Sequence, residues 1–394
     1  MSSWLSKGVS RKRIRTGYYQ ETPAGTFTEK DRPATVVSAY YEMASKYPPQ
    51  QYRQWIRNFL ENCGCYLVFF CEEDLVPFIT ECRKEYTDKT DIIVLPREEW
   101  IANKEFDQRF WKDQLLNDPE ANIHSTDLYK VWFEKKEFVR RAVVKNPFKH
   151  TDFVWCDAGF CRSEGLKDLI KDFPNANRIP TDKILFNNIG QFTERDSAEK
   201  VINGVSIKEV SGKMRIDGSC IAASNSMWQL YSKLYDGVME KFFKARLFLG
   251  KDQDVMATLV LENPDLVSLV EPKQFLPDQW FYLQLLLAAP KPLFDLLMDG
   301  KASSQKRTYD ELYTLAYPRP LLPQPQQLPP STNIIEQFRQ PSRISSQMVQ
   351  VPRVANTVAP SKPNSEEYWL QQGLITSGAG STSSRSLDGP RRWL

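Results

Sequence analysis

The side chain best suited to chemistry is Asp157, which stands where a short apolar run breaks at a glycine. Residues 151–159 read Thr-Asp-Phe-Val-Trp-Cys-Asp-Ala-Gly, which predicts a central strand that carries Asp157 to the rim of a sheet. Ligands of open α/β sheets bind outside the carboxyl ends of the strands, where a carboxylate can hold a hard cation or a ribose hydroxyl. The alternative, that Asp157 only caps the turn before Gly159, has equal weight.

Lys135 is the second candidate, because it falls on the apolar face of a strongly patterned helix predicted between Ser125 and Asn146. It lies seven residues after Leu128 and seven before Ala142, so it points towards the core. A lysine there must extend its amine to water, pair with a carboxylate or meet a ligand anion. We favour a carboxylate or a ligand, since this helix leads directly into the Asp157 strand.

Four further residues suit a ligand site, three through a polar side chain and one, a glycine, through the lack of a side chain. Asp252 and Gln253 begin a predicted helix, where acids suit the helix dipole or face the cleft as a base or acceptor-binding group. Gly218, in a predicted strand over 214–224, allows close approach to its backbone. Lys46 lies in the loop after the first predicted strand and can meet a phosphate, although the residue type alone favours a solvated lysine.

The elements that position these residues alternate between strand and helix. Strands are predicted over 35–41, 66–70, 91–95, 183–187 and 214–224, and helices over 50–62 and 74–86, whereas 96–123 is irregular and aromatic, a lid or packing at the sheet edge. This alternation predicts an α/β fold, a Rossmann-type three-layer sandwich with a mostly parallel central sheet. No strand is followed by the glycine fingerprint of dinucleotide enzymes or by a P-loop.

Composition excludes several classes of protein. The net charge of +3 over 394 residues is small and interspersed, so no nucleic acid partner is expected. The seven cysteines lie mostly in apolar runs, which is typical of free thiols in a reducing compartment, and two histidines assemble no zinc signature. No apolar run reaches the length of about 20 residues that a transmembrane segment needs. We therefore expect a cytoplasmic protein.

Roughly residues 34 to 287 resemble the HtrL/YibB family, also called WlaTC-like, whose members are expected to be glycosyltransferases. The matching pieces occur in the family's order. They are Thr-Val-Val-Ser-Ala-Tyr-Tyr at 35–41, Ala-Ser-Lys-Tyr at 44–47 with Tyr52 and Trp55, Leu-Tyr-Lys-Val-Trp at 128–132 with Lys135, Asn-Pro-Phe at 146–148, and Trp-Cys-Asp-Ala-Gly at 155–159.

The resemblance implies a GT-A-like nucleotide-sugar transferase fold, in which an acidic motif at a strand end holds the donor, usually through a divalent cation such as manganese or magnesium. Asp157 looks like the first acid of that motif, but Gly159 stands where a second carboxylate is usual. Metal dependence is therefore open, with Asp157 as the metal ligand. Asp252 and Gln253 are similar to an acid and glutamine that many such enzymes carry before a late helix. Lys135, with Lys46 and Lys130, would balance the diphosphate.

Composition predicts a flexible basic N-terminal arm (1–32), and the resemblance implies a GT-A-like nucleotide-sugar transferase domain (33–290), which a peripheral helical segment (291–317) follows. Composition predicts a disordered tail rich in Pro, Gln and Ser over 318–394. Its Pro-Leu-Leu-Pro at 320–323 is a weak match to the peptides that partner proteins bind, and we favour the interpretation that this segment is a plain linker.

The expected function is transfer of a sugar from a nucleotide-diphospho-sugar donor to an acceptor hydroxyl of a glycan or glycoconjugate. Asp157 would fix the ribose or the metal, Lys135 would neutralise the leaving diphosphate, and Asp252 would act as general base. The alternative is a catalytically inactive, transferase-like scaffold whose tail recruits partners, which Gly159 favours. A nuclease or phosphohydrolase needs more converging acids than the sequence offers.

Overall fold

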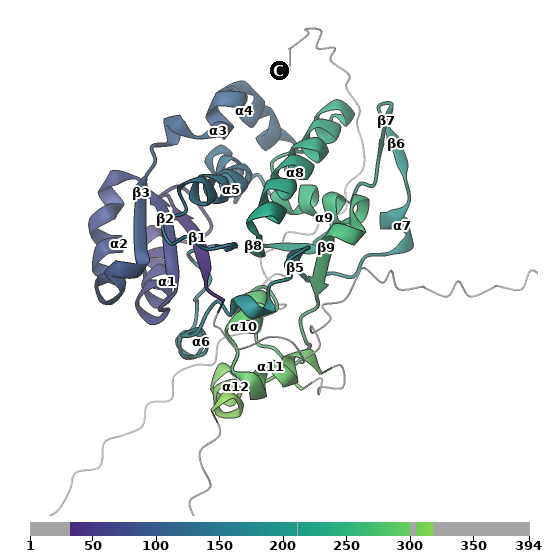
Figure 1. Cartoon of the computed structure of the whole chain (residues 1–394). Coiled ribbons are helices and arrows are strands. Elements are labelled where there is room, and N and C mark those ends of the chain that lie inside the picture. The colour runs from purple at the N-terminus through teal and green to yellow at the C-terminus, as the bar shows by residue number, and fades with distance from the viewer. Residues whose placement is uncertain (1–31, 211, 300–304, 318–394) are drawn as a thin grey trace, which may run out of the picture. The chain divides into compact units, whose positions relative to one another are not determined.

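The structure is a computed structural model that describes residues 32–210, 212–299 and 305–317 (Figure 1). The predicted tail, and the predicted N-terminal arm up to residue 31, lie outside the described residues. Arg32, the last residue of that arm, is described, and its guanidinium lies 2.9 Å from the buried carboxylate of Asp152. This ion pair joins the start of the described chain to the strand that leads to Asp157.

The centre of the fold is a seven-stranded sheet with the order β3-β2-β1-β4-β8-β5-β9. Every neighbouring pair is parallel except those that β8 makes with β4 and β5, which are antiparallel. The expected mostly parallel sheet is therefore confirmed. Its strands are β1 (Ala34–Tyr40), β2 (Tyr66–Cys71), β3 (Thr90–Val94), β4 (Asp152–Cys156), β5 (Ile184–Asn188), β8 (Ile216–Ser224) and β9 (Val267–Val270), and β6 (Lys200–Ile202) and β7 (Val205–Ile207) form a separate hairpin.

Helices cover both faces of this sheet, as Figure 1 shows for α5 and α8 on one side and α10 on the other. Of the described helices, none has the length and apolar content needed to span a membrane. The first face packs against α1 (Pro49–Asn62), α2 (Val76–Cys82), α6 (Glu164–Leu169), α10 (Tyr282–Ala288), α11 (Lys291–Met298) and α12 (Tyr309–Ala316), and the second against α3 (Ile101–Glu105), α4 (Gln108–Asn117), α5 (Thr126–Lys145), α8 (Asn225–Ala245) and α9 (Asp252–Glu262). A short helix, α7 (Glu194–Ser197), precedes the hairpin.

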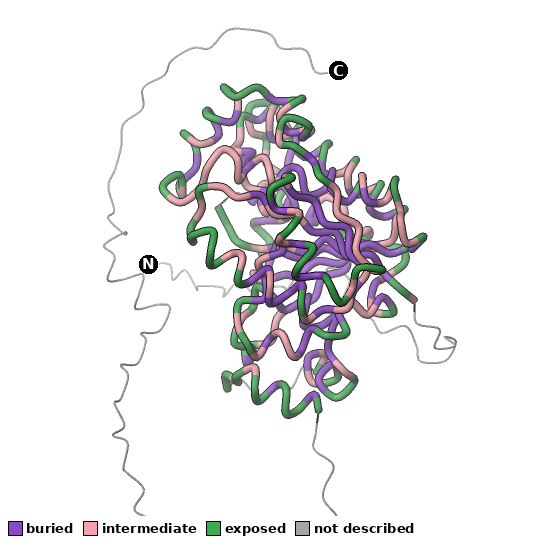
Figure 2. Tube along the Cα trace, turned by 90° about the vertical axis from the view of Figure 1, so that its left-hand side faces the viewer, coloured by how far each residue is buried: buried purple, intermediate pink, exposed green. Residues whose placement is uncertain are grey.

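The two cores explain why the strands are continuous apolar runs. Along β1, Val36 lies in one core and Val37 in the other, and along β4 the same holds for Val154 and Trp155. Successive side chains of a strand point to opposite faces, so a sheet covered on both sides needs apolar residues at every position. Figure 2 shows the buried residues running through the middle of the molecule. The expected three-layer sandwich is confirmed.

Two local predictions were wrong. The single helix expected over 74–86 is three shorter helical segments, with Pro77 near the start of α2 and non-helical dihedral angles at Tyr86. The region 96–123 is not irregular but contains α3 and α4, the latter capped by Asp107, whose carboxylate accepts from the Phe110 N–H at 2.8 Å. In both regions the boundaries depend on capping and proline positions rather than on hydrophobic periodicity.

Candidate functional site

One edge of the sheet gathers the predicted site residues. Asp157 follows β4 directly, and its backbone N–H donates to the carbonyl oxygen of Ser219 at 2.8 Å. Because β8 is antiparallel to β4, the beginning of β8 lies beside the carboxyl end of β4. This pairing brings Gly218, some sixty residues later in the chain, next to Asp157.

The Lys135 ammonium is the centre of the site. Its Nζ lies 2.9 Å from Asp252 Oδ2 and 3.3 Å from Asp157 Oδ1, and it donates to the Gly218 carbonyl oxygen at 2.9 Å. The Gly218 carbonyl accepts a hydrogen bond from this ammonium, and the two carboxylates lie at ion-pair distance from it. We call Lys135, Asp157, Asp252 and Gly218 the Lys135 cluster. Of the two partners expected for Lys135, a carboxylate or a ligand, the structure shows carboxylates.

Burial and charge act against each other in this cluster. Burial alone would lower the pKa of Lys135, but the carboxylates of Asp157 and Asp252 outweigh that effect and raise it. Burial raises the pKa of Asp252, and the Lys135 ammonium only partly offsets the rise. The Asp252 side chain is 5% exposed, whereas that of Asp157 is 39% exposed. Asp157 is therefore the carboxylate of the cluster that a ligand reaches first.

Gly218 explains how a lysine and an aspartate come so near a strand backbone. A Cβ atom at this position would lie 2.9 Å from Asp252 Oδ2, 3.0 Å from Met256 Cε and 3.3 Å from Lys135 Nζ. A larger residue would push the ion pair off the Gly218 carbonyl. The close approach predicted at Gly218 is present, and the groups that approach are side chains of this chain.

The substitution Gly218→Ala is expected to lower the free energy of unfolding by about 1–3 kcal/mol, because the added methyl group overpacks the cluster. Urea denaturation measures the change. Gly237→Ala is the matched control, since Gly237 lies on the exposed side of α8 with nothing within 4 Å of the added Cβ. Equal stabilities of the two variants would contradict the proposed close fit at Gly218.

Two residues that the sequence did not single out complete the site. Trp155 Nε1 donates to Asp157 Oδ1 at 2.8 Å, which fixes the carboxylate on the α5 side of the sheet. Asp217, buried beside the cluster, accepts from the N–H of Ser219 at 2.8 Å and its hydroxyl at 2.7 Å. The i, i+2 spacing of Trp155 and Asp157 signals a shared face. No local signal marks Asp217, which depends on the β8 pairing.

The structure does not bring the other predicted residues into the Lys135 cluster. Gln253 donates from Nε2 to the carbonyl oxygen of Ile216 at 3.0 Å. Lys130 pairs with Asp127 on the same helix, with an Nζ–Oδ1 distance of 3.3 Å. Lys46 is exposed, and its Nζ lies 5.6 Å from the centre of the Tyr47 ring. Their contact with a ligand stays a prediction.

A second group of potential cation ligands lies nearby in sequence but is engaged within the protein. Ligand atoms of Asp118, Glu120 and His124 lie within 4.8 Å of one another. Asp118 Oδ2 is 2.7 Å from His124 Nδ1 and accepts from the Tyr129 hydroxyl, and Glu120 pairs with Lys251 at 3.0 Å. These contacts tie the end of α4 to the residue before Asp252, so their evident role is to hold the start of α9.

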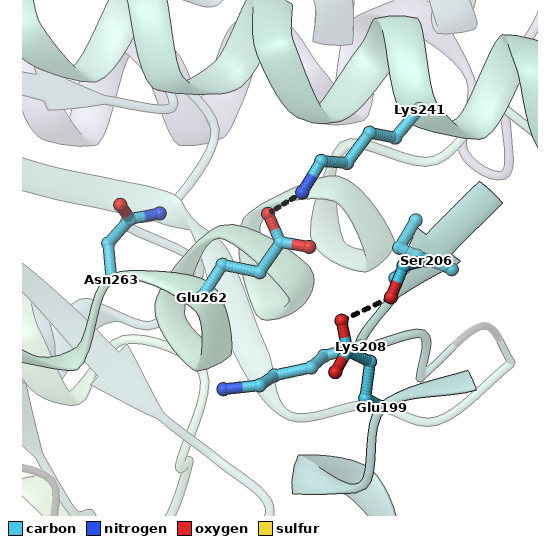
Figure 3. Close-up of a pocket in the computed structure, with 7 residues that line it drawn as sticks. Glu199, Ser206, Lys208, Lys241, Glu262 and Asn263 are labelled. Atoms are coloured by element: carbon cyan, nitrogen blue, oxygen red, sulfur yellow. Dashed lines mark hydrogen bonds and ion pairs between the residues drawn. The ribbon is translucent and has the colours of Figure 1, made fainter. Parts of the chain in front are cut away.

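A cleft of about 270 Å³ lies between β7 and the ends of α8 and α9, and none of the predicted site residues lines it (Figure 3). Lys241 pairs with Glu262 across it at 2.7 Å, and Ser206 donates to Glu199. Lys208 donates to the carbonyl oxygen of Leu261 at 2.9 Å. The charged side chains that line this cleft contact one another, Ser206 or the backbone, so we assign the cleft no ligand.

Comparisons with known proteins identify a family. Residues 34–287 match the model of a family described as "Bacterial protein of unknown function (HtrL_YibB)". No protein with a curated description matches the sequence.

Solved structures with distant similarity include mouse xyloside xylosyltransferase 1 in its apo form, 12% identical, covering 65% of this chain and 93% of that chain with a TM-score of 0.36. Another is core-mannan synthase A (CmsA/Ktr4) from Aspergillus fumigatus in an Mn/GDP form, 10% identical, covering 68% of this chain and 79% of that chain, also with a TM-score of 0.36.

Proposed function

This chain belongs to the HtrL/YibB family, and from that premise we propose that it is a glycosyltransferase. The donor is a nucleotide-diphospho-sugar and the acceptor a hydroxyl of a glycan or glycoconjugate. The observation that carries the proposal is the Lys135 cluster, with an accessible carboxylate and a buried ammonium at the carboxyl edge of a mostly parallel sheet. Open sheets of this kind bind ligands at that edge.

The chemistry of the cluster suits a hydroxyl-rich ligand. Carboxylates accept hydrogen bonds from ribose and sugar hydroxyls, and Trp155 and Lys135 hold Asp157 in one orientation for that purpose. Lys135 also offsets part of the negative charge of Asp157 and Asp252, which would otherwise repel an anionic donor at this edge. Glycosyl transfer expels a diphosphate, so positive charge near the leaving group lowers the barrier.

In the proposed reaction the acceptor oxygen attacks the anomeric carbon of the donor sugar. The bond from that carbon to the diphosphate oxygen breaks, and its electron pair leaves with the diphosphate. Asp252 takes the acceptor's proton, and its raised pKa makes it a stronger base than an ordinary aspartate. A single displacement of this kind inverts the anomeric centre.

A divalent cation fits this site only in part. The position between Asp157 and Asp252 holds the Lys135 ammonium, so a cation cannot bridge the two carboxylates there. Asp157 Oδ2 is the remaining oxygen of the accessible carboxylate and would hold manganese or magnesium together with the donor and water. A bound cation would stabilise charge on the diphosphate.

We propose a cytoplasmic location for the protein. All seven cysteines are free and buried, which suits a reducing compartment. Burial raises the pKa of Cys156 and Cys220, so neither behaves as a reactive thiolate.

Calorimetry and thermal shift with uridine, guanosine and cytidine diphosphates and their sugars, with and without manganese, test the proposal. One of these nucleotides is expected to bind saturably and, at about 100 times its Kd, to stabilise the protein by about 2.7 kcal/mol. Asp157→Ala should abolish the effect. Asp113→Ala, which removes an exposed carboxylate on α4, should leave it intact.

A folded protein that binds none of these nucleotides would refute the transferase proposal. Such a result would favour the alternative function, an inactive transferase-like scaffold. Gly159 favours that alternative, because it removes the second acid of the usual motif.

A further inference from the structure

An arginine at the rim of the same sheet edge has no assigned role. Arg162 lies five residues after Asp157, in the loop between β4 and α6, and its side chain is exposed. Its Nε donates to the carbonyl oxygen of Gly159 at 3.3 Å. The guanidinium is therefore held at the position in the loop where the usual second carboxylate is missing.

Three aromatic rings fix this guanidinium in place. Its central carbon lies 4.7 Å from the centre of the Trp55 ring, 5.0 Å from that of Phe281 and 5.8 Å from that of Tyr47. The rings come from α1, from the segment before α10 and from the loop after β1. A cation over the face of an aromatic ring is attracted by the ring's negative face, so each of these contacts favours the observed rotamer. An exposed arginine without them would sample many rotamers.

The charge of Arg162 is not neutralised within the part of the chain that the structure describes. No carboxylate among those residues forms an ion pair with it, and its only hydrogen bond uses Nε. The two terminal NH₂ groups thus remain available to a ligand. In this respect Arg162 differs from Lys135, whose side chain is 8% exposed and whose ammonium already meets three oxygens of the protein.

We propose that Arg162 is the residue that binds the donor diphosphate, through the planar edge of its guanidinium, while Lys135 holds the carboxylates beneath. This inference rests on the proposed function and names the cation that meets the diphosphate. A guanidinium presents two parallel N–H donors that match phosphate oxygens, and a side chain already held in place loses less entropy on binding. The charge also lies next to Gly159, where a metal ligand is lacking.

Titration calorimetry with EDTA present tests this role, using uridine, guanosine and cytidine diphosphates and inorganic diphosphate as probes. Arg162→Gln should weaken binding of the nucleoside diphosphate by about tenfold or more, because it removes charge-assisted hydrogen bonds. Arg162→Lys keeps the charge but loses the planar edge of the guanidinium, so its affinity for the nucleoside diphosphate should lie between those of the wild type and Arg162→Gln. Arg57→Gln is the matched control and should change affinity less than about twofold, since Arg57 pairs with Glu61 on the surface of α1.

The outcomes separate this inference from the proposed function. Nucleotide binding that Asp157→Ala abolishes but Arg162→Gln leaves unchanged would overturn the role of Arg162 and leave the transferase proposal standing. Inorganic diphosphate binding that depends on Arg162, without binding of any nucleotide, would support the anion site and refute the transferase. A wild-type protein that binds none of the probes would overturn both.

Discussion

Replacing Lys135 with methionine is expected to lower the free energy of unfolding by about 3–5 kcal/mol at neutral pH and to abolish donor binding. Methionine fills a similar volume but leaves the Asp252 carboxylate buried without its counter-charge, and the Gly218 carbonyl without its donor. Removing one partner of a buried ion pair costs more than the pair contributes, because the remaining charge stays desolvated. Urea denaturation and nucleotide calorimetry measure the two effects.

The loss of stability in Lys135→Met should shrink as the pH falls towards about 5. Without Lys135, the pKa of Asp252 rises further, so the carboxylate takes up a proton and its desolvation cost disappears. For the same reason, Lys135→Met combined with Asp252→Asn should be more stable than Lys135→Met alone.

Lys130→Met is the matched control for this experiment. It makes the same substitution on the same helix, but Lys130 pairs with a half-exposed carboxylate, so the expected loss is below about 1 kcal/mol. If Lys135→Met proved no less stable than Lys130→Met, the buried ion pair would not be a stabilising feature of this fold.

Replacing Asp217 with asparagine is expected to change how stability depends on pH. Burial raises the pKa of Asp217 to about 7, although hydrogen bonds from Ser219 and Asn187 favour its charged form. The folded protein therefore keeps a proton that the unfolded chain releases near pH 4. The stabilisation is complete below about pH 4 and is lost as the pH rises through about 7. Asparagine has no proton to release, so the stability of the variant does not fall over this pH range for that reason.

The measurement is the difference in unfolding free energy between Asp217→Asn and the wild type in urea, from about pH 4 to pH 8. That difference should move in favour of the variant by up to about 1.4 kcal/mol for each pH unit between about 4 and 7. Asp113→Asn, at an exposed carboxylate, should follow the wild type across the range. A constant difference for Asp217→Asn would show that Asp217 is charged in the folded protein at neutral pH.

Much of the fold was predictable because its signals are local. Strands and helices are recognised from the types of residues that lie two, three or four positions apart. This signal is clear in β1, β2, β4, α1 and α5, whose predicted boundaries lie within about two residues of the observed ones. Periodicity failed in the region 96–123, where α4 begins at the Asp107 cap and the first N–H groups of α3 donate to the distant Glu134 carboxylate. Lys135 was identifiable for the same local reason, since it interrupts an apolar face.

By itself, the sequence determined the strand that leads to Asp157, the inward direction of Lys135 and the room for a close approach at Gly218. Only the tertiary structure decided what these residues meet. The antiparallel insertion of β8 between β4 and β5 brings Gly218 and Asp217 to Asp157, and the packing of α1 and α10 encloses Arg162 in aromatic rings. Strand order and direction follow from burying whole faces of the sheet, and no spacing along the chain encodes such contacts between distant residues.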